Sequence, residues 1–275
     1  MKNFSSLKKN EWQAWAKNFQ TFYPPWRPST ERIQIYRQLI KKYVKGNKIL
    51  VLGATPEIRD MLTKMKFKVT LIDMSPMMVK AMTSLRKTKS KEKIIIHNWL
   101  TAKFKDRFDF IIGDSVVNNL HPKQINLFLR QLTKWLSKKG ILILQNCVLC
   151  RPLPSIKISL DQIIKKLKYH PEYYHNYLNR AHDYQSYWYS TAKNHLNDLG
   201  KLEILFNQLY QRSALTKKEF SVMKMGFNSP SMISFYTDKE FQKMLKGYFK
   251  VLNTRQEQGH KVHKDFYKIY ILTNK

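Results

Sequence analysis

The sequence lacks any apolar run of the roughly 18 to 20 residues that a membrane-spanning helix needs. Its first 15 residues, MKNFSSLKKNEWQAW, also lack the apolar stretch of a signal peptide. We therefore expect a soluble, cytoplasmic protein without a membrane span.

Cysteine is scarce, with only Cys147 and Cys150, in the stretch QNCVLC. A structural zinc site needs a second pair of ligands, and none follows at metal spacing. A redox Cys-x-x-Cys opens a helix after a strand, whereas this pair ends an apolar run. We expect two reduced thiols and no metal.

Acidic residues are also few, because 19 Asp and Glu stand against 50 Lys and Arg, which gives a formal net charge of +31. Such a charge attracts nucleic acid or an anionic membrane surface. The lysines are nevertheless spread along the chain, in runs no longer than pairs such as Lys41-Lys42 and Lys138-Lys139. An AT-biased genome would enrich lysine in the same way, so nucleic acid remains a possible partner and not a predicted one.

What is present suffices for a substantial core, since 43% of the 275 residues are hydrophobic. From residue 46 onward, short apolar runs alternate with amphipathic stretches, which is typical of a parallel sheet wound with helices. The expected strands are 48–53, 68–73, 93–99, 108–114 and 140–147, and the expected helices are 56–66, 75–87 and 121–140.

The helix boundaries follow from capping residues. Thr55 and Ser75 stand before prolines at a first helical position, and Gly140 is expected to terminate the third helix. After a polar, aromatic-rich interval, the stretch TDKE at 237–240 forms a capping box ahead of a further helix. Two last strands, 248–256 and 265–274, are too close in sequence for a parallel crossover, so they should form an antiparallel hairpin.

This pattern divides the chain into three parts. Residues 1–45 form a helical lead-in or cap, residues 46–150 and 236–275 form the sheet-containing core, and residues 151–235 form a helical insertion that would serve as a substrate lid.

Ligands of parallel sheets bind beyond the carboxyl ends of the strands. A dinucleotide site would need Gly-x-Gly-x-x-Gly, but here Pro56 removes an amide donor and Glu57 adds negative charge. These residues suit a ligand with adenosine and no diphosphate. The candidate contacts at the strand ends are Gly53, Ala54, Thr55, Asp73, Asn98, Trp99, Asp114 and Ser115.

Five stretches, VLGATPEIRDML, LIDMSPMMV, HNWL, FDFIIGDSVVNNL and GILILQN, carry a resemblance in their order and spacing. They resemble the motifs of the class I S-adenosylmethionine-dependent methyltransferases, over residues 45–150 and the terminal hairpin. The resemblance implies an α/β fold with a doubly wound, Rossmann-like, seven-stranded and mostly parallel sheet, whose last strand is antiparallel.

S-adenosylmethionine is the cofactor that this resemblance implies. The loop 53–55 would approach its methionine part, Glu57 would face its ammonium group, and Asp114 would contact its amino-acid end. The sequence departs from the family in this loop, which holds one glycine where two or three are common.

The same resemblance assigns the adenosine contacts. Asp73 would bind both ribose hydroxyls, Met74 and Met78 would flank the adenine, and Asn98 and Trp99 would close over it. The alternatives are that Asp73 caps the next helix and that Trp99 and the two methionines belong to the core.

Methyl transfer mainly requires alignment and exclusion of water, so a general base is optional. The candidates for one are His121, His182 and Tyr184, of which His121 alternatively only leads into its helix. The substrate candidates are the aromatic residues Tyr23, Trp26 and Tyr36, together with Arg27, which could hold a carboxylate or a phosphate.

Three functions stay open. The favoured one is a methyltransferase for a small-molecule acceptor. An RNA or protein methyltransferase would use the basic surface, although GDSVVNNL lacks the Asn-Pro-Pro-aromatic pattern of amino-nitrogen methylation of nucleic acids. The third is a non-methylating user or binder of the same cofactor.

Overall fold

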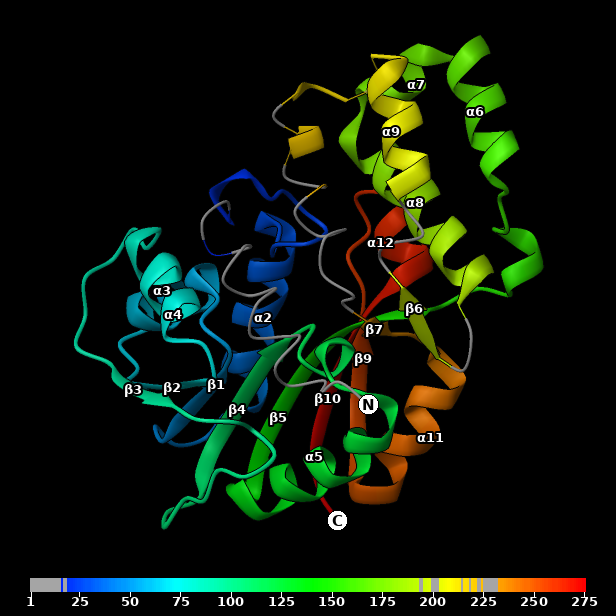
Figure 1. Ribbon diagram of the computed structural model, residues 1–275. Helices are drawn as coiled ribbons and strands as arrows, with labels where there is room; N and C mark the ends of the chain where they lie inside the picture. Colours follow the sequence, from blue (N-terminus) through cyan, green and yellow to red (C-terminus); the bar gives the residue numbers. More distant parts are fainter. Residues whose placement is uncertain are drawn as a thin grey trace.

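A mixed sheet organises the chain, as Figure 1 shows for the computed structural model. The structure describes residues 16, 19–192, 195–198, 203–213, 215–217, 219–221, 224 and 232–275. The main strands lie in the order β3-β2-β1-β4-β5-β10-β9. Their bounds are β1 Ile49–Leu52, β2 Val69–Asp73, β3 Lys93–Ile96, β4 Phe108–Asp114, β5 Leu136–Leu149, β9 Phe249–Arg255 and β10 Tyr267–Asn274.

The strand directions confirm the predicted fold class. Strands β1 to β5 pair in parallel, whereas β10 is antiparallel to both β5 and β9. Strand β8 (Tyr236–Thr237) adds a short parallel pairing to the end of β5. A separate antiparallel pair joins β6 (Leu196–Asp198) to β7 (Met232–Ser234).

Both faces of the sheet are covered by helices, which is why the central strands β1, β2 and β4 are mostly apolar and buried. Alternate residues of β1 enter different cores: Leu50 and Leu52 pack with α5 and α11, and Ile49 and Val51 pack with α2, α3 and α4. The helices are α2 Thr30–Tyr43, α3 Pro56–Lys64, α4 Pro76–Ser84, α5 Pro122–Trp135 and α11 Asp238–Tyr248.

The three predicted N-cap residues occupy N-cap positions, and two of them make the expected side-chain hydrogen bond. The Ser75 hydroxyl accepts from the Met78 N–H at the start of α4, and Thr237 and Glu240 form the predicted capping box of α11. Thr55 occupies the N-cap position of α3, but its side chain makes no cap hydrogen bond.

The predicted end of the third core helix was wrong. Helix α5 ends at Trp135, and β5 begins at the next residue, so Gly140 lies inside the strand. Leu136 is fully buried and pairs with Phe108, which opens β4. Burial of an apolar side chain against the neighbouring strand outweighs the tendency of the preceding helix to continue to a glycine.

The last two strands pair as predicted, but their connection holds a short helix, α12 (Lys261–Phe266), that the sequence analysis missed. Six residues are too few to reveal a helical period. The His260 side chain begins this helix by accepting from the Val262 N–H.

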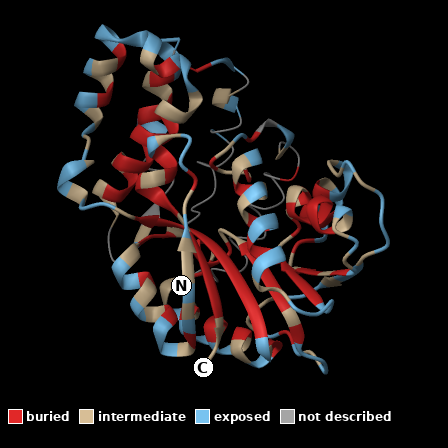
Figure 2. Cartoon of the chain, turned by 180° about the vertical axis from the view of Figure 1, so that it is seen from behind, coloured by how far each residue is buried: buried red, intermediate tan, exposed pale blue. Residues whose placement is uncertain are grey.

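Helices of the interval 151–235 form a third core, against the carboxyl end of β5 and the start of β10. Its buried members include Tyr184 and Phe206 from the helices and Cys147 and Tyr267 from the strands. In Figure 1 these helices stand beyond the end of the sheet, and Figure 2 shows their outer sides exposed. They are α6 Leu160–Tyr169, α7 Pro171–His175, α8 Tyr177–Thr191 and α9 Glu203–Gln211, preceded by the 3-10 turn η3 Leu153–Ser155.

The predicted lead-in is described only from Ala16 and from Phe19 onward, where the 3-10 turn η1 (Phe19–Thr21) precedes α2. Residues 1–15 lie outside the described residues, and the three-part division of the chain stays a prediction. Within the described ranges, none of the helices combines the length and apolarity needed to cross a bilayer.

Candidate functional site

The ends of β1, β2 and β3 converge at Gly53. Its φ of +84° lies in the left-handed region that favours glycine, and its N–H donates to the Ile72 carbonyl at 2.8 Å. A Cβ atom at this position would lie 3.9 Å from Oδ2 of Asp73 and 4.0 Å from Cζ2 of Trp99. The structure therefore brings three of the predicted cofactor contacts around one bare stretch of backbone.

Trp99 is held in place by both polar and apolar contacts. Its Nε1 donates to the Ile72 carbonyl at 3.0 Å, and its ring packs against Phe128 with centroids 6.0 Å apart. Asn98 stabilises the turn here, because its Oδ1 accepts from the Leu100 N–H at 2.9 Å. The half-buried indole is thus fixed beside Gly53.

Asp73 is a partly buried carboxylate, and burial raises its pKa to about 6 against the effect of the N–H groups of Ser75, Met74 and Ala54. Its Oδ1 accepts from the Ser75 N–H at 2.8 Å. The N-cap of α4 is Ser75 and not Asp73. Met78 is one of the residues of α4 that are buried in the core.

Glu57, in the first turn of α3, is bound by Arg27. The guanidinium donates to Oε1 from Nε at 2.8 Å and from Nη2. The second carboxylate oxygen, Oε2, is buried and accepts no hydrogen bond from the described residues. Arg27 thus joins the segment before α2 to the turn after Gly53, and its guanidinium is already paired with a carboxylate.

Asp114, at the end of β4, lies in a buried cluster with α2. The Tyr36 hydroxyl donates to its Oδ2 at 2.6 Å, and Arg32 Nη1 donates at 3.2 and 3.3 Å. The other side of the Arg32 guanidinium donates from Nε to Glu257 at 2.7 Å. Burial raises the pKa of Asp114, while Arg32 and Tyr36 act against that rise.

This buried cluster limits the further contacts that Tyr36 and Asp114 can make. Tyr36, a substrate candidate, is fully buried with its hydroxyl on Asp114. A contact of Asp114 with a cofactor would have to share the carboxylate with Arg32. Sequence analysis missed Arg32, although an arginine one turn before Tyr36 on the apolar side of α2 was a usable signal.

Ser115 follows with a φ of +54°, an uncommon conformation for a residue other than glycine. Its N–H donates to the Gln145 carbonyl at 2.8 Å, and its hydroxyl donates to Gln145 Oε1 at 2.9 Å. Gln145, a buried residue that sequence analysis missed, therefore fixes the turn after β4.

The three candidate bases lie on separate elements. The ring of His121 caps α5, where Nδ1 accepts from the Lys123 N–H at 3.2 Å. His182 lies between two carboxylates, with Nε2 2.9 Å from Asp265 Oδ2 and Nδ1 3.3 Å from Asp183 Oδ1. These contacts give both histidines structural partners, and their catalytic roles stay predictions.

Tyr184, the third candidate, is buried in α8 against Phe206, with ring centroids 4.8 Å apart. Burial raises the pKa of its hydroxyl above the ordinary value, and no described residue bonds to that oxygen. A hydroxyl that resists ionisation is a poor base, so a role for Tyr184 would be hydrogen bonding.

Aromatic contacts join the segment before α2 to the insertion. Trp26 stacks on Trp188 of α8 with centroids 6.1 Å apart and planes 9° from parallel. Tyr23, which is largely exposed, meets Tyr177 edge-on at 5.6 Å. Two segments that are far apart in sequence thus meet over the carboxyl end of the sheet.

Cys147 and Cys150 are free thiols, as the sequence predicts. Burial raises the pKa of both to about 12. Neither thiol therefore ionises near neutral pH, which disfavours a redox role.

Comparison with known proteins adds a family and a fold. A family model described as a methyltransferase domain matches residues 53–203, which is more than half of the chain. No curated protein matches the sequence.

Solved structures resemble the chain over nearly its whole length. The N-methyltransferase NodS of Bradyrhizobium japonicum, in complex with S-adenosyl-L-homocysteine, is 13% identical, with a TM-score of 0.53 over 96% of this chain and 98% of its own. The CcbJ methyltransferase of Streptomyces caelestis is 8% identical, with a TM-score of 0.59 over 97% and 98%. A Rhodobacter sphaeroides protein described as a zinc-dependent alcohol dehydrogenase is 12% identical, with a TM-score of 0.63 over all of both chains. At these identities the likeness concerns the fold alone.

Proposed function

The chain belongs to the methyltransferase domain family, and on that premise we propose that it transfers the methyl group of S-adenosylmethionine to a small-molecule acceptor. The observation that carries the proposal is the convergence of Gly53, Asp73 and Trp99 at the carboxyl ends of three parallel strands. NodS, which shares this fold, is known in complex with the demethylated cofactor.

The residues at these strand ends fit the cofactor. Asp73 would accept both ribose hydroxyls, and the bare backbone at Gly53 would admit the methionine part. The unpartnered Oε2 of Glu57 suits an ammonium group. Trp99 would cover the adenosine from the side of β3. When bound, the cofactor supplies a sulfonium methyl group for in-line displacement.

The rest of the site would position the acceptor and exclude water. Trp26 and Trp188 stack where the lead-in meets the insertion, and the third core seals the insertion against β5 and β10. Because the carboxyl end of the sheet is covered from two directions, a small acceptor suits the site better than a polymer.

The side chain of Asn118, within GDSVVNNL, also disfavours an amino-nitrogen acceptor held by this motif. Its Nδ2 donates to the carbonyls of Cys147 and Ser234 at 2.9 and 2.8 Å, and its Oδ1 accepts from the Cys147 N–H at 2.9 Å. The amide is thus committed to joining β5 and β7. We also place the protein in the cytoplasm, where its two free thiols would stay reduced.

The test is formation of S-adenosylhomocysteine from S-adenosylmethionine in the presence of small phenols, amines, thiols and carboxylates, with RNA and a basic peptide as separate arms. We expect turnover that depends on a small acceptor, is lost in Asp73→Ala and is kept in Asp106→Ala, which changes an exposed carboxylate. Turnover that depends on RNA and falls steeply with salt would contradict the small-molecule assignment. Consumption of cofactor without any acceptor would contradict methyl transfer.

A further inference from the structure

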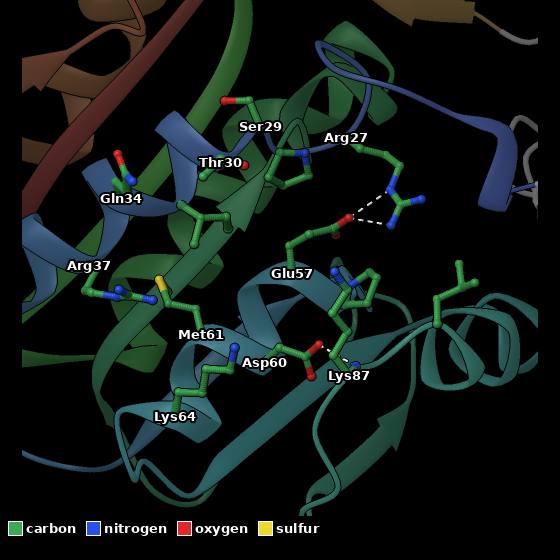
Figure 3. A pocket seen from close by; sticks show the side chains of 14 residues that line it. Arg27, Ser29, Thr30, Gln34, Arg37, Glu57, Asp60, Met61, Lys64 and Lys87 are labelled. Carbon is green, nitrogen blue, oxygen red and sulfur yellow. Dashed lines mark hydrogen bonds and ion pairs between the residues drawn. The ribbon is translucent and has the colours of Figure 1, made fainter.

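A groove of about 390 Å³ lies between α2 and α3, on the outer side of the cofactor loop. Figure 3 shows Thr30, Gln34 and Arg37 of α2 along one wall and Glu57 and Lys64 of α3 along the other. A cavity of this volume is large enough for a small organic molecule.

Both carboxylates in the groove already have a cationic partner. Glu57 is paired with Arg27 at one end. Asp60 accepts from Arg86 Nε at 3.1 Å and from the backbone N–H of Lys87 at 2.7 Å. Each acid is therefore paired with an arginine of the fold, Glu57 with Arg27 and Asp60 with Arg86.

Three cations in the groove are free. The side chains of Arg37, Lys64 and Lys87 line it, all three residues are exposed, and no described residue accepts a hydrogen bond or forms an ion pair with their charged groups. These three side chains therefore give the groove a positive charge that no carboxylate of the described residues neutralises. The guanidinium of Arg27, in contrast, is paired with Glu57.

The groove also has apolar lining besides its charged and polar side chains. Several lining residues have no polar side-chain atom, namely Pro28, Ile33, Pro56, Met61 and Leu85. A polyanion held only by its phosphates would gain nothing from such a surface, because its backbone is hydrophilic. An apolar body attached to one anionic group would use both features.

We propose that this groove binds a small organic anion, with its carboxylate or phosphate oxygens on Arg37 and Lys64 and its apolar body against the half-buried Ile33. A guanidinium donates two parallel hydrogen bonds to such an oxyanion, and an ammonium adds a point charge. The groove borders the cofactor loop at Glu57, but Arg37, Lys64 and Ile33 are not among the proposed cofactor contacts, and the site does not depend on methyl transfer.

Isothermal titration calorimetry at low salt tests the proposal with phenyl phosphate, benzoate and neutral benzyl alcohol as probes. The two anions should bind the wild type, and the tighter of them identifies the preferred headgroup. Arg37→Glu and Lys64→Glu should each weaken binding at least about tenfold, since each removes a charge-assisted contact and adds repulsion.

Lys239→Glu is the matched control, because it makes the same charge change at an exposed position of α11. It should leave the affinity of the anions unchanged. S-adenosylhomocysteine, titrated into each variant, reports that the fold and the cofactor site are intact. Equal binding of benzyl alcohol and phenyl phosphate, or equal weakening by Lys239→Glu, would overturn the anion site. Loss of S-adenosylhomocysteine binding by the wild type would instead overturn the proposed function.

Discussion

Asp73 is the residue on which the proposed function depends most. Its carboxylate lies beside the bare backbone of Gly53, and burial has raised its pKa to about 6. The ionised carboxylate can accept hydrogen bonds from two hydroxyl groups at both oxygens, whereas the protonated carboxyl group carries an O–H donor on one of them. With Asp73 as the proposed ribose contact, the raised pKa would make cofactor binding dependent on pH.

Affinity for S-adenosylhomocysteine should be constant above a pH of about 6 and should fall below it, by up to about tenfold per pH unit, because Asp73 becomes protonated. Titration calorimetry between pH 5 and 8 measures this dependence. Asp73→Asn should bind weakly with no inflection near 6. An inflection of the same size in Asp73→Asn would assign the titration to another group.

The raised pKa of Asp73 also affects the stability of the folded protein without cofactor. This stability changes with pH in the opposite direction to cofactor affinity. The native protein binds the Asp73 proton more tightly than the unfolded chain, whose value is near 3.8. The contribution of Asp73 to stability is therefore fully present below a pH of about 4 and is lost as the pH rises through about 6.

The residues that the sequence identified are those placed by a strand end. Gly53, Asp73 and Trp99 each follow an apolar run, and parallel strands bring such positions to one edge. The missed residues act through distant partners: Arg32 and Glu257 are 225 positions apart, and Gln145 acts on Ser115. A local sequence pattern does not predict pairs of residues that are so far apart in the chain.

At the scale of elements, α2 is tied to the sheet by a buried charge cluster. The side chain of Arg32 is 0% exposed, and its partners Asp114 and Glu257 are 6% and 2% exposed. Removing the cation would leave two buried carboxylates without their main partner.

Arg32→Ala should lower the free energy of unfolding by about 3 to 5 kcal/mol, measured by urea denaturation. The control is Lys48→Ala, which breaks the exposed pair of Lys48 with Asp106 and should cost less than about 1 kcal/mol. Similar losses in the two variants would show that the buried cluster does not anchor α2.

Element boundaries were harder to predict than the elements themselves. The strand 108–114 matches β4 residue for residue, because its apolar run is bounded by polar residues. The end of α5 depends on the packing of Leu136, and the short helix α12 lies in the connection between β9 and β10. Neither feature produces a periodic signal in the sequence.

At the scale of the whole molecule, the sheet would supply the proposed cofactor edge, and the segment before α2 meets the helices of the interval 151–235 through Trp26 and Trp188. The fold class followed from the alternation of strands and helices, since this pattern has few stable topologies. The acceptor did not follow, because the covering segments have no motif and their contacts, such as Trp26 with Trp188, join distant parts of the chain. The formal net charge of +31 does not identify the acceptor either, because the charged residues are spread along the whole chain.

The most direct test of the central claim is calorimetric titration of the wild type and of Asp73→Ala with S-adenosylmethionine, S-adenosylhomocysteine and NAD. We predict that both sulfur compounds bind the wild type and that NAD does not. In Asp73→Ala their affinity should fall at least about 30-fold, since two hydrogen bonds to a charged group are lost. Absence of binding by both sulfur compounds, or an unchanged affinity in Asp73→Ala, would contradict the account.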